Sequence, residues 1–211
     1  MLTQSEEGLH EGALNVILGI SSMKLSIQQI YLEKLDSELE PLGFKRTKSS
    51  NQWKRKIGKL DQEWIHLNFG IGVINPSFGV NYLDLKKAMP KDVRATYTVS
   101  KMLSSITSNL YSVNSPPEIL SSDILNFSLG ELERLRNRSD VIDLLKSDNV
   151  KSWPVFSFSH RIRILPLLLA CEGEVDELFV FAEEFSKYTD KDQIIPKYGE
   201  YMKHLTNAFS G

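Results

Sequence analysis

The sequence has few of the residues from which metal and disulfide sites are built. Cys171 is the single cysteine, so a disulfide within the chain is excluded. It lies in the apolar run ILPLLLAC, where a thiol is expected to be buried and to act as a small hydrophobic residue. The four histidines are His10, His66, His160 and His204, and no two of them are four residues apart. No zinc-ligand spacing results, and we expect neither a metal nor a cofactor.

Motifs of common enzyme classes are also missing. No G-x-S-x-G elbow occurs, and the adjacent Ser159 and His160 have no third group in the sequence to orient them. Gly70-Ile71-Gly72 begins a G-x-G pattern, but Asn75 breaks both the dinucleotide and the phosphate-loop templates, so these glycines favour a bulge or close packing. We therefore predict no catalytic residues. A hydrolase assembled from residues distant in the sequence is left as a third hypothesis.

Long apolar runs and strong net charge are absent too. No stretch approaches the ~20 apolar residues that span a bilayer. Residues 13–20 resemble the apolar part of a signal peptide, but Glu6, Glu7 and Glu11 precede them where basic residues are required. The net charge of −2 gives the whole molecule no attraction for phosphate backbones. We predict a cytoplasmic protein without a membrane partner.

The patterning indicates one domain preceded by an extension. Residues 1–22 share no pattern with the rest, and Met23 would itself be a natural bacterial start. We predict an extension over 1–22 and a single α+β domain over 23–211. Within the domain, residues 23–113 should form a helix and a sheet, and residues 118–211 should be mainly helical. The adjacent prolines at 116 and 117 separate these parts, because they continue neither a strand nor a helix.

Alternating apolar and polar residues predict the sheet. From Glu63 to Phe69 the alternation is regular, which is typical of a strand with one face in a core. Asn75-Pro76-Ser77 indicates a turn, and Thr96 to Ser108 fits either a strand or a helix, its first half favouring a strand. Strands are predicted at 51–58, 62–72 and 77–83. The predicted fold is an antiparallel β-meander of three to five strands packed against an N-terminal helix, with a C-terminal helical group.

Helical spacing surrounds this sheet. An amphipathic helix is expected over 26–39, ended by Pro41 and Gly43. Ser128, with Glu131 three residues later, predicts a capping box at the start of a later helix. The helices predicted after the prolines cover 128–146 (as one or two helices), 161–171, 175–188 and 197–209. Gly173 should join the second and third of these as a helical hairpin.

A basic segment coincides with the first predicted hairpin. From Gly43 to Lys59 every charged residue is basic, namely Lys45, Arg46, Lys48, Lys54, Arg55, Lys56 and Lys59. Trp53, Trp64 and His66 occupy positions where an open sheet face would carry polar residues. Exposed aromatic rings beside basic groups would suit a protein-binding patch or a stacking platform for nucleic acid. Alternatively, the lysines protect an edge strand from aggregation and a helix covers the tryptophans.

An acidic run begins at the end of the apolar segment. It contains Glu172, Glu174, Asp176, Glu177, Glu183 and Glu184 and no basic residue. Acidic side chains at a helix start are favoured by the helix dipole, so a solvated face is one interpretation. A second interpretation is that paired carboxylates act as a general acid and base. A third is a surface that attracts a basic partner, because opposite charge speeds association.

The segments LGFKR, QWKRKIG, NFGIGV and FGVNY, which follow one another within residues 26–83, resemble the domain-of-unknown-function 4304 family of bacterial proteins. The resemblance implies a helix, a Leu-Gly-Phe-basic start, an aromatic-containing strand and a later strand rich in asparagine. Some members are thought to be immunity proteins that neutralise toxins of neighbouring bacteria. The family supplies no catalytic residues.

We therefore predict a non-enzymatic protein-binding protein, with an immunity or toxin-neutralising role as the form that the resemblance implies. The predicted partner-binding residues are Trp53, Trp64, His66, Glu172, Glu174, Asp176 and Glu177. The alternative is a nucleic-acid-binding module that uses the basic hairpin 43–59, through Lys45, Arg46, Lys54, Arg55, Lys56 and Trp53.

Overall fold

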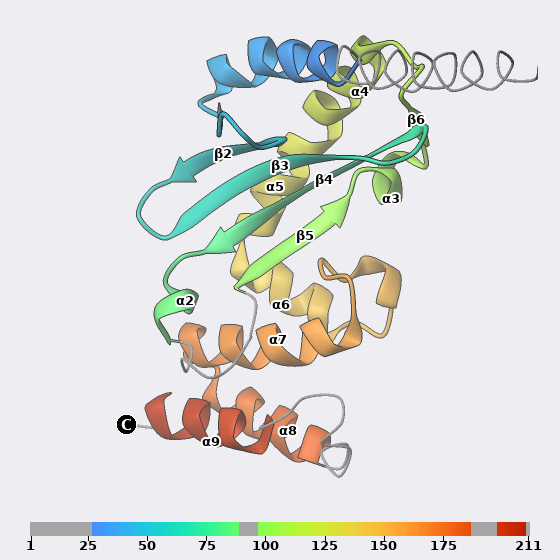
Figure 1. The fold of residues 1–211 in the computed structure, drawn as a ribbon. Coiled ribbons are helices and arrows are strands. Elements are labelled where there is room, and N and C mark those ends of the chain that lie inside the picture. The colour runs from blue at the N-terminus through green and yellow to red at the C-terminus, as the bar shows by residue number, and fades with distance from the viewer. Residues whose placement is uncertain (1–26, 89–96, 187–197, 210–211) are drawn as a thin grey trace, which may run out of the picture.

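The first helix, residues 27–39, lies across one end of the sheet (Figure 1). The structure is a computed structural model that describes residues 27–88, 97–186 and 198–209, so the extension predicted for 1–22 lies outside the described residues. Leu35 and Leu39 point into the core and are 1% and 0% exposed. A 3-10 turn, η1 (Glu40–Leu42), follows, and Gly43 ends it with a φ of 85°, a conformation that glycine adopts without strain.

The sheet is an antiparallel meander in the order β1-β2-β3-β4-β5, and β6 also pairs with β4. Its strands are β1 (Lys45–Arg46), β2 (Gln52–Ile57), β3 (Asp61–Phe69), β4 (Val73–Tyr82), β5 (Thr98–Met102) and β6 (Tyr111–Ser112). The predicted α+β class and meander are confirmed, and the undecided segment 96–108 contains a strand in its first half. The two-residue β6 makes the sheet one strand larger than predicted, because so short a pairing leaves no alternation to recognise.

The second turn of the meander lies earlier than the sequence suggested. Asn75-Pro76-Ser77 was predicted to be a turn, but it lies inside β4, where Pro76 pairs with Leu67. The chain reverses instead at Gly70 to Val73, where Gly72 has a φ of 74°. These glycines, predicted to mark a bulge or close packing, therefore form a turn. Pro76 accepts a hydrogen bond from Leu103 N–H on the β5 side, so its missing N–H does not interrupt the β3 ladder.

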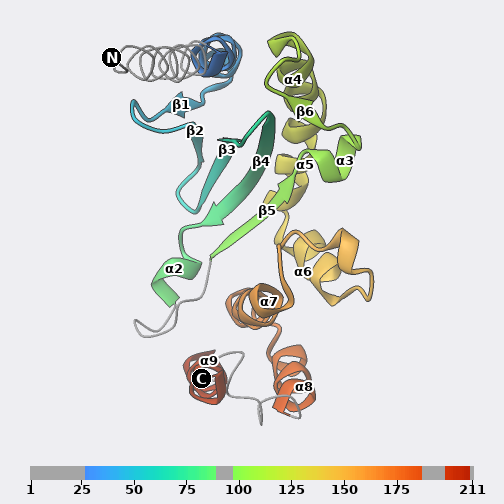
Figure 2. The same cartoon turned by 45° about the vertical axis from the view of Figure 1, so that its right-hand side comes forward.

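One long helical segment covers the core face of the sheet. It runs through α4 (Pro117–Asp123), the π-helical turn η2 (Ile124–Ser128) and α5 (Leu129–Arg136), and Figure 2 shows it beside β4 and β5. The capping box predicted at Ser128 is therefore wrong, because Ser128 lies inside this continuous helical segment and is 1% exposed. Glu131 instead pairs with Lys101 of β5 at 2.8 Å.

The remaining helices form the predicted C-terminal group. They are α6 (Arg138–Lys146), α7 (Phe158–Glu172), α8 (Val175–Ser186) and α9 (Tyr198–Phe209), with the short elements α2 (Leu85–Ala88), α3 (Ser104–Thr107) and η3 (Val150–Ser152) in the connections. Gly173, with a φ of 79°, joins α7 to α8 as the predicted hairpin. Tyr198 and Tyr201 donate hydrogen bonds to backbone carbonyls of α7, which fixes α9 against it. One hydrophobic cluster extends from Tyr31 to Leu205.

Buried charges connect the sheet to the helices. Glu63 of β3 is 0% exposed and lies between Arg55 of β2 and Arg136 of α5. Its Oε2 lies 2.6 Å from Arg55 Nη2, and its Oε1 lies 3.1 Å from Arg136 Nε. A carboxylate removed from water is tolerated here because two guanidinium groups compensate its charge.

Candidate binding surfaces

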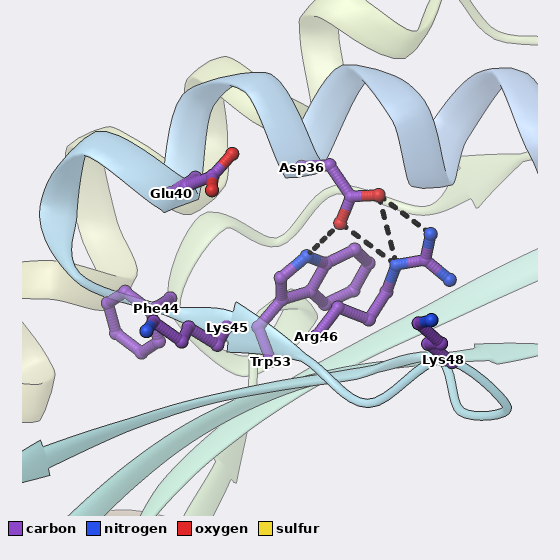
Figure 3. A pocket seen from close by; sticks show the side chains of 7 residues that line it. All are labelled: Asp36, Glu40, Phe44, Lys45, Arg46, Lys48 and Trp53. Atoms are coloured by element: carbon purple, nitrogen blue, oxygen red, sulfur yellow. Dashed lines mark hydrogen bonds and ion pairs between the residues drawn. The ribbon is translucent and has the colours of Figure 1, made fainter.

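A cavity of about 420 Å³ opens between the first helix and the edge strand β1 (Figure 3). Trp53 and Phe44 form its apolar floor, and both rings belong to the core, at 1% exposure each. The polar lining comes from the first helix, from η1, and from β1 and the loop after it, and it consists of Asp36, Glu40, Lys45, Arg46 and Lys48. The cavity therefore combines an aromatic floor with charges of both signs.

Asp36 organises this cavity by binding two side chains at once. Its Oδ1 accepts hydrogen bonds from the Trp53 indole N–H at 2.7 Å and from Arg46 Nε at 2.9 Å, and its Oδ2 accepts from Arg46 Nη2 at 2.7 Å (Figure 3). The pairing of Arg46 with Asp36 is bidentate, which fixes the guanidinium plane as well as its position. Asp36 was not among the residues predicted to form a site. Its one signal in the sequence is an acidic residue directly after Leu35 within the predicted amphipathic helix.

The ionised form of Asp36 is favoured in the fold. The hydrogen bond from Arg46 lowers the pKa of this carboxyl, and the Trp53 N–H and the Arg46 charge act in the same direction, against the opposing effect of burial. A depressed pKa in the folded state adds stability above the ordinary value of 3.8, and this stability is lost as the pH falls below that value.

We expect the free energy of unfolding of the wild type to exceed that of Asp36→Asn at neutral pH, and the difference to shrink as the pH falls below 3.8. Urea unfolding of both proteins at pH 7, 5, 4 and 3 measures it. At each pH, the difference between the two free energies of unfolding cancels the contribution of the carboxyl groups that both proteins share. These include Asp61, whose pKa is raised by burial. A difference that stays constant down to pH 3 would show that the Asp36 charge adds no stability.

The predicted aromatic residues do not share one face of the sheet. Trp53 pairs with Ile65 and therefore faces the helices, whereas Trp64 pairs with Lys54 on the opposite face. The helix-covered alternative is thus confirmed for Trp53, whose N–H is bonded to the first helix. Trp64 is also buried, at 9% exposure, so neither ring offers a free stacking surface. His66 lies half-buried beyond Trp64, and burial lowers the pKa of its imidazole.

The face that carries Trp64 is otherwise lined with polar side chains. A hydrogen-bonded row crosses its strands, in which Thr98 Oγ1 donates to Asn81 Oδ1 at 2.7 Å and Asn81 Nδ2 donates to Gln62 Oε1 at 3.2 Å. Gly79 is the neighbour of Trp64 in β4, and an added Cβ there would lie 2.8 Å from Trp64 Cζ2. The indole therefore lies against a strand position without a side chain, which explains how so large a ring is buried on a polar face.

The basic segment divides into neutralised arginines and unpaired lysines. Arg46 pairs with Asp36, and Arg55 pairs with Glu63. The lysines of this segment form no ion pair with any residue that the structure describes, and we call them the basic edge: Lys45, Lys48, Lys54, Lys56 and Lys59. They lie on the edge strand β1, on its neighbour β2, in the loop between these strands and in the turn after β2. All are exposed except Lys54, which is half-buried.

The predicted acidic surface is partly consumed inside the protein. Glu172 pairs with Arg138 at 3.0 Å, and Glu177 pairs with Lys146 at 2.8 Å. Glu174 and Asp176 remain exposed at the α7–α8 junction. Figure 1 shows this junction near the opposite end of the molecule from the first helix, so the acidic and basic surfaces do not form one site.

Among the residues that the structure describes, neither Cys171 nor the histidine and acidic side chains are arranged for thiol or metal chemistry. Burial raises the pKa of the half-buried Cys171 thiol to about 11, which keeps it protonated at neutral pH. In the described parts of the chain, no group of three or more histidine, cysteine, aspartate or glutamate side chains is arranged to hold a metal ion. Among the same residues, no helix has the length and apolar character needed to cross a membrane.

Comparison with known proteins leaves the family open. No family model, curated protein or solved structure matches the chain, and the resemblance to the domain-of-unknown-function 4304 family stays a prediction.

Proposed function

We propose that the protein is a non-enzymatic binding protein that attaches to an acidic surface of another protein through its basic edge. Binding itself would be the function, because a protein that covers its partner needs no cofactor or catalytic group. A bacterial immunity protein that neutralises a toxin is the form of this function that the resemblance implies.

The observation that supports this proposal is the uneven pairing of the basic segment. Its two arginines have carboxylate partners within the fold, whereas the lysines of the basic edge have none among the described residues. Unpaired positive side chains along one edge of a sheet attract a surface of opposite sign and raise the rate of encounter. The cavity beside Lys45 and Lys48 adds a concave feature to this area, which a flat solvated surface would lack.

A protein partner accounts for the geometry better than nucleic acid does. The nucleic-acid alternative relied on Trp53 as a stacking ring, but this ring is in the core. It also relied on the positive charges of Arg46 and Arg55, which Asp36 and Glu63 compensate within the fold. Binding of single strands generally combines a basic groove with accessible aromatic rings, and only the basic component is present in this hairpin.

Charge reversal on the basic edge is the test. The variant Lys45→Glu/Lys54→Glu/Lys56→Glu should lose a stoichiometric protein partner that the tagged wild-type chain retains at 50 and 200 mM salt during affinity capture from its native cells. The matched control, Lys87→Glu/Lys151→Glu/Lys203→Glu, makes the same change in net charge at exposed lysines elsewhere and should retain the partner. Mass spectrometry identifies the partner, and a nuclease-treated sample runs in parallel.

Two outcomes would contradict the proposal. Equal retention by both triple variants would show that the basic edge is not the contact surface. In the second outcome, the wild-type chain captures nucleic acid at 50 mM salt that is lost at 200 mM salt or after nuclease treatment. That result would favour the nucleic-acid alternative over a protein partner. If the lysines only protect the edge strand β1, reversal would leave the captured proteins unchanged.

A further inference from the structure

We propose that the cavity in Figure 3 is the specificity pocket of this surface, and that Arg46 and Lys48 there bind a single carboxylate from an acidic side chain of the partner. This inference rests on the proposed function, because it identifies which part of the partner the basic edge recognises. It differs from that function in requiring a defined site in place of general attraction between surfaces.

Arg46 is held so that one edge of its guanidinium remains available. Asp36 accepts hydrogen bonds from Nε and Nη2, and Nη1 has no hydrogen-bond partner among the described residues. Trp53 lies beneath the guanidinium, with 5.9 Å between the Arg46 Cζ and the ring centroid. An arginine fixed in this way loses little conformational entropy on binding an anion, and its planar geometry suits a carboxylate.

Lys48 supplies the second positive group. It lines the same cavity as Arg46, and Figure 3 shows its ammonium beneath the outer edge of the guanidinium. Lys48 is exposed and forms no ion pair with a described residue. Among the residues that line this end of the cavity, Arg46 and Lys48 are positive and Asp36 is negative. Glu33, which is not part of the lining, also acts on the Arg46 charge. The lining itself therefore carries an excess of positive charge, which suits a carboxylate.

The rest of the cavity suits a protein segment. Phe44 and Trp53 provide an apolar floor next to the charged end. The volume of about 420 Å³ lies within the ~300–1,000 Å³ typical of ligand sites, so it can accept a side chain together with neighbouring atoms. Glu40 and Lys45 lie at the other end of the cavity. They offer hydrogen-bonding groups to the backbone of the partner's segment or to a second polar side chain of that segment.

Nuclear magnetic resonance of the full chain tests the pocket with a capped peptide of four glutamates, at pH 6.5 and constant ionic strength. Titration should produce saturable shifts of the Trp53 indole N–H and the Arg46 Nε–H resonances, because both groups share Asp36. Lys48→Ala should weaken the affinity about tenfold, the effect of losing a hydrogen bond to a charged group. The control Lys59→Ala removes the same charge outside the cavity and should change the affinity less than twofold.

The possible failures can be told apart. Equal weakening by Lys48→Ala and Lys59→Ala, or an absence of shifts at Trp53 and Arg46, would overturn the pocket. Saturable shifts with inorganic phosphate but not with the peptide would overturn the carboxylate assignment and indicate a phosphoryl ligand. If the triple reversal of the basic edge still abolishes partner capture while Lys48→Ala leaves it unchanged, the pocket fails and the proposed function stands.

Discussion

Replacing Glu63 with alanine should lower the free energy of unfolding by about 3 kcal/mol. Removing one partner of a buried ion pair typically costs ~3–5 kcal/mol, because it leaves uncompensated charge in the interior. Glu63 is fully buried, whereas the side chains of Arg55 and Arg136 keep 24% and 29% of their surface exposed. Since both arginine side chains are partly exposed, we expect the lower end of this range. The two arginines would also repel each other once the carboxylate is removed.

Urea unfolding followed by circular dichroism measures this effect. Glu133→Ala is the matched control, because Glu133 is an exposed partner of the same Arg136 on α5, at 4.0 Å. A surface pair of this kind contributes little, so the control should lose less than about 0.5 kcal/mol. Comparable losses in the two variants would show that burial of Glu63 between two arginines gives it no special contribution.

The burial of Glu63 also marks the limit of what the sequence alone could predict. The alternation from Glu63 to Phe69 correctly predicted β3 and placed Ile65 and Leu67 in the core. By the same alternation Glu63 lies on the core face, where a carboxylate is unfavourable unless it is paired. One of its partners, Arg136, is far away in the sequence and belongs to a helix, and local periodicity carries no information about such a contact.

The candidate site shows the same division between local and long-range information. The basic segment was evident from composition, and the helix ending near Pro41 and Gly43 was evident from spacing. Whether Trp53 faces solvent or core depends on its pairing with Ile65, and a shift of one residue reverses the face of every side chain. The role of Asp36 likewise requires the position of the first helix over β1. Tertiary contacts therefore decide which charges are free to bind.

Gly79 is the position where the structure demands a residue that alternation does not specify. The second large expected effect is that Gly79→Ala lowers the free energy of unfolding by about 1–3 kcal/mol, the usual cost of overpacking. A Cβ would lie 2.2 Å from Val99 O and 2.7 Å from Ser100 Cβ, so β4 and β5 would have to separate. Val99 O is a backbone atom and cannot rotate away as a side chain can.

The control variant, Gly130→Ala, is expected to change the free energy of unfolding in the opposite direction. Gly130 lies in α5, and a Cβ added there meets no atom within 4 Å. Gly130→Ala should raise the free energy of unfolding by about 0.5–1 kcal/mol, because alanine favours the helix and restricts the unfolded chain. Urea midpoints of the two variants should therefore move in opposite directions from the wild type. If Gly79→Ala is neutral or stabilising, β4 and β5 are not packed as closely as the structure places them, and Trp64 is not held against Gly79.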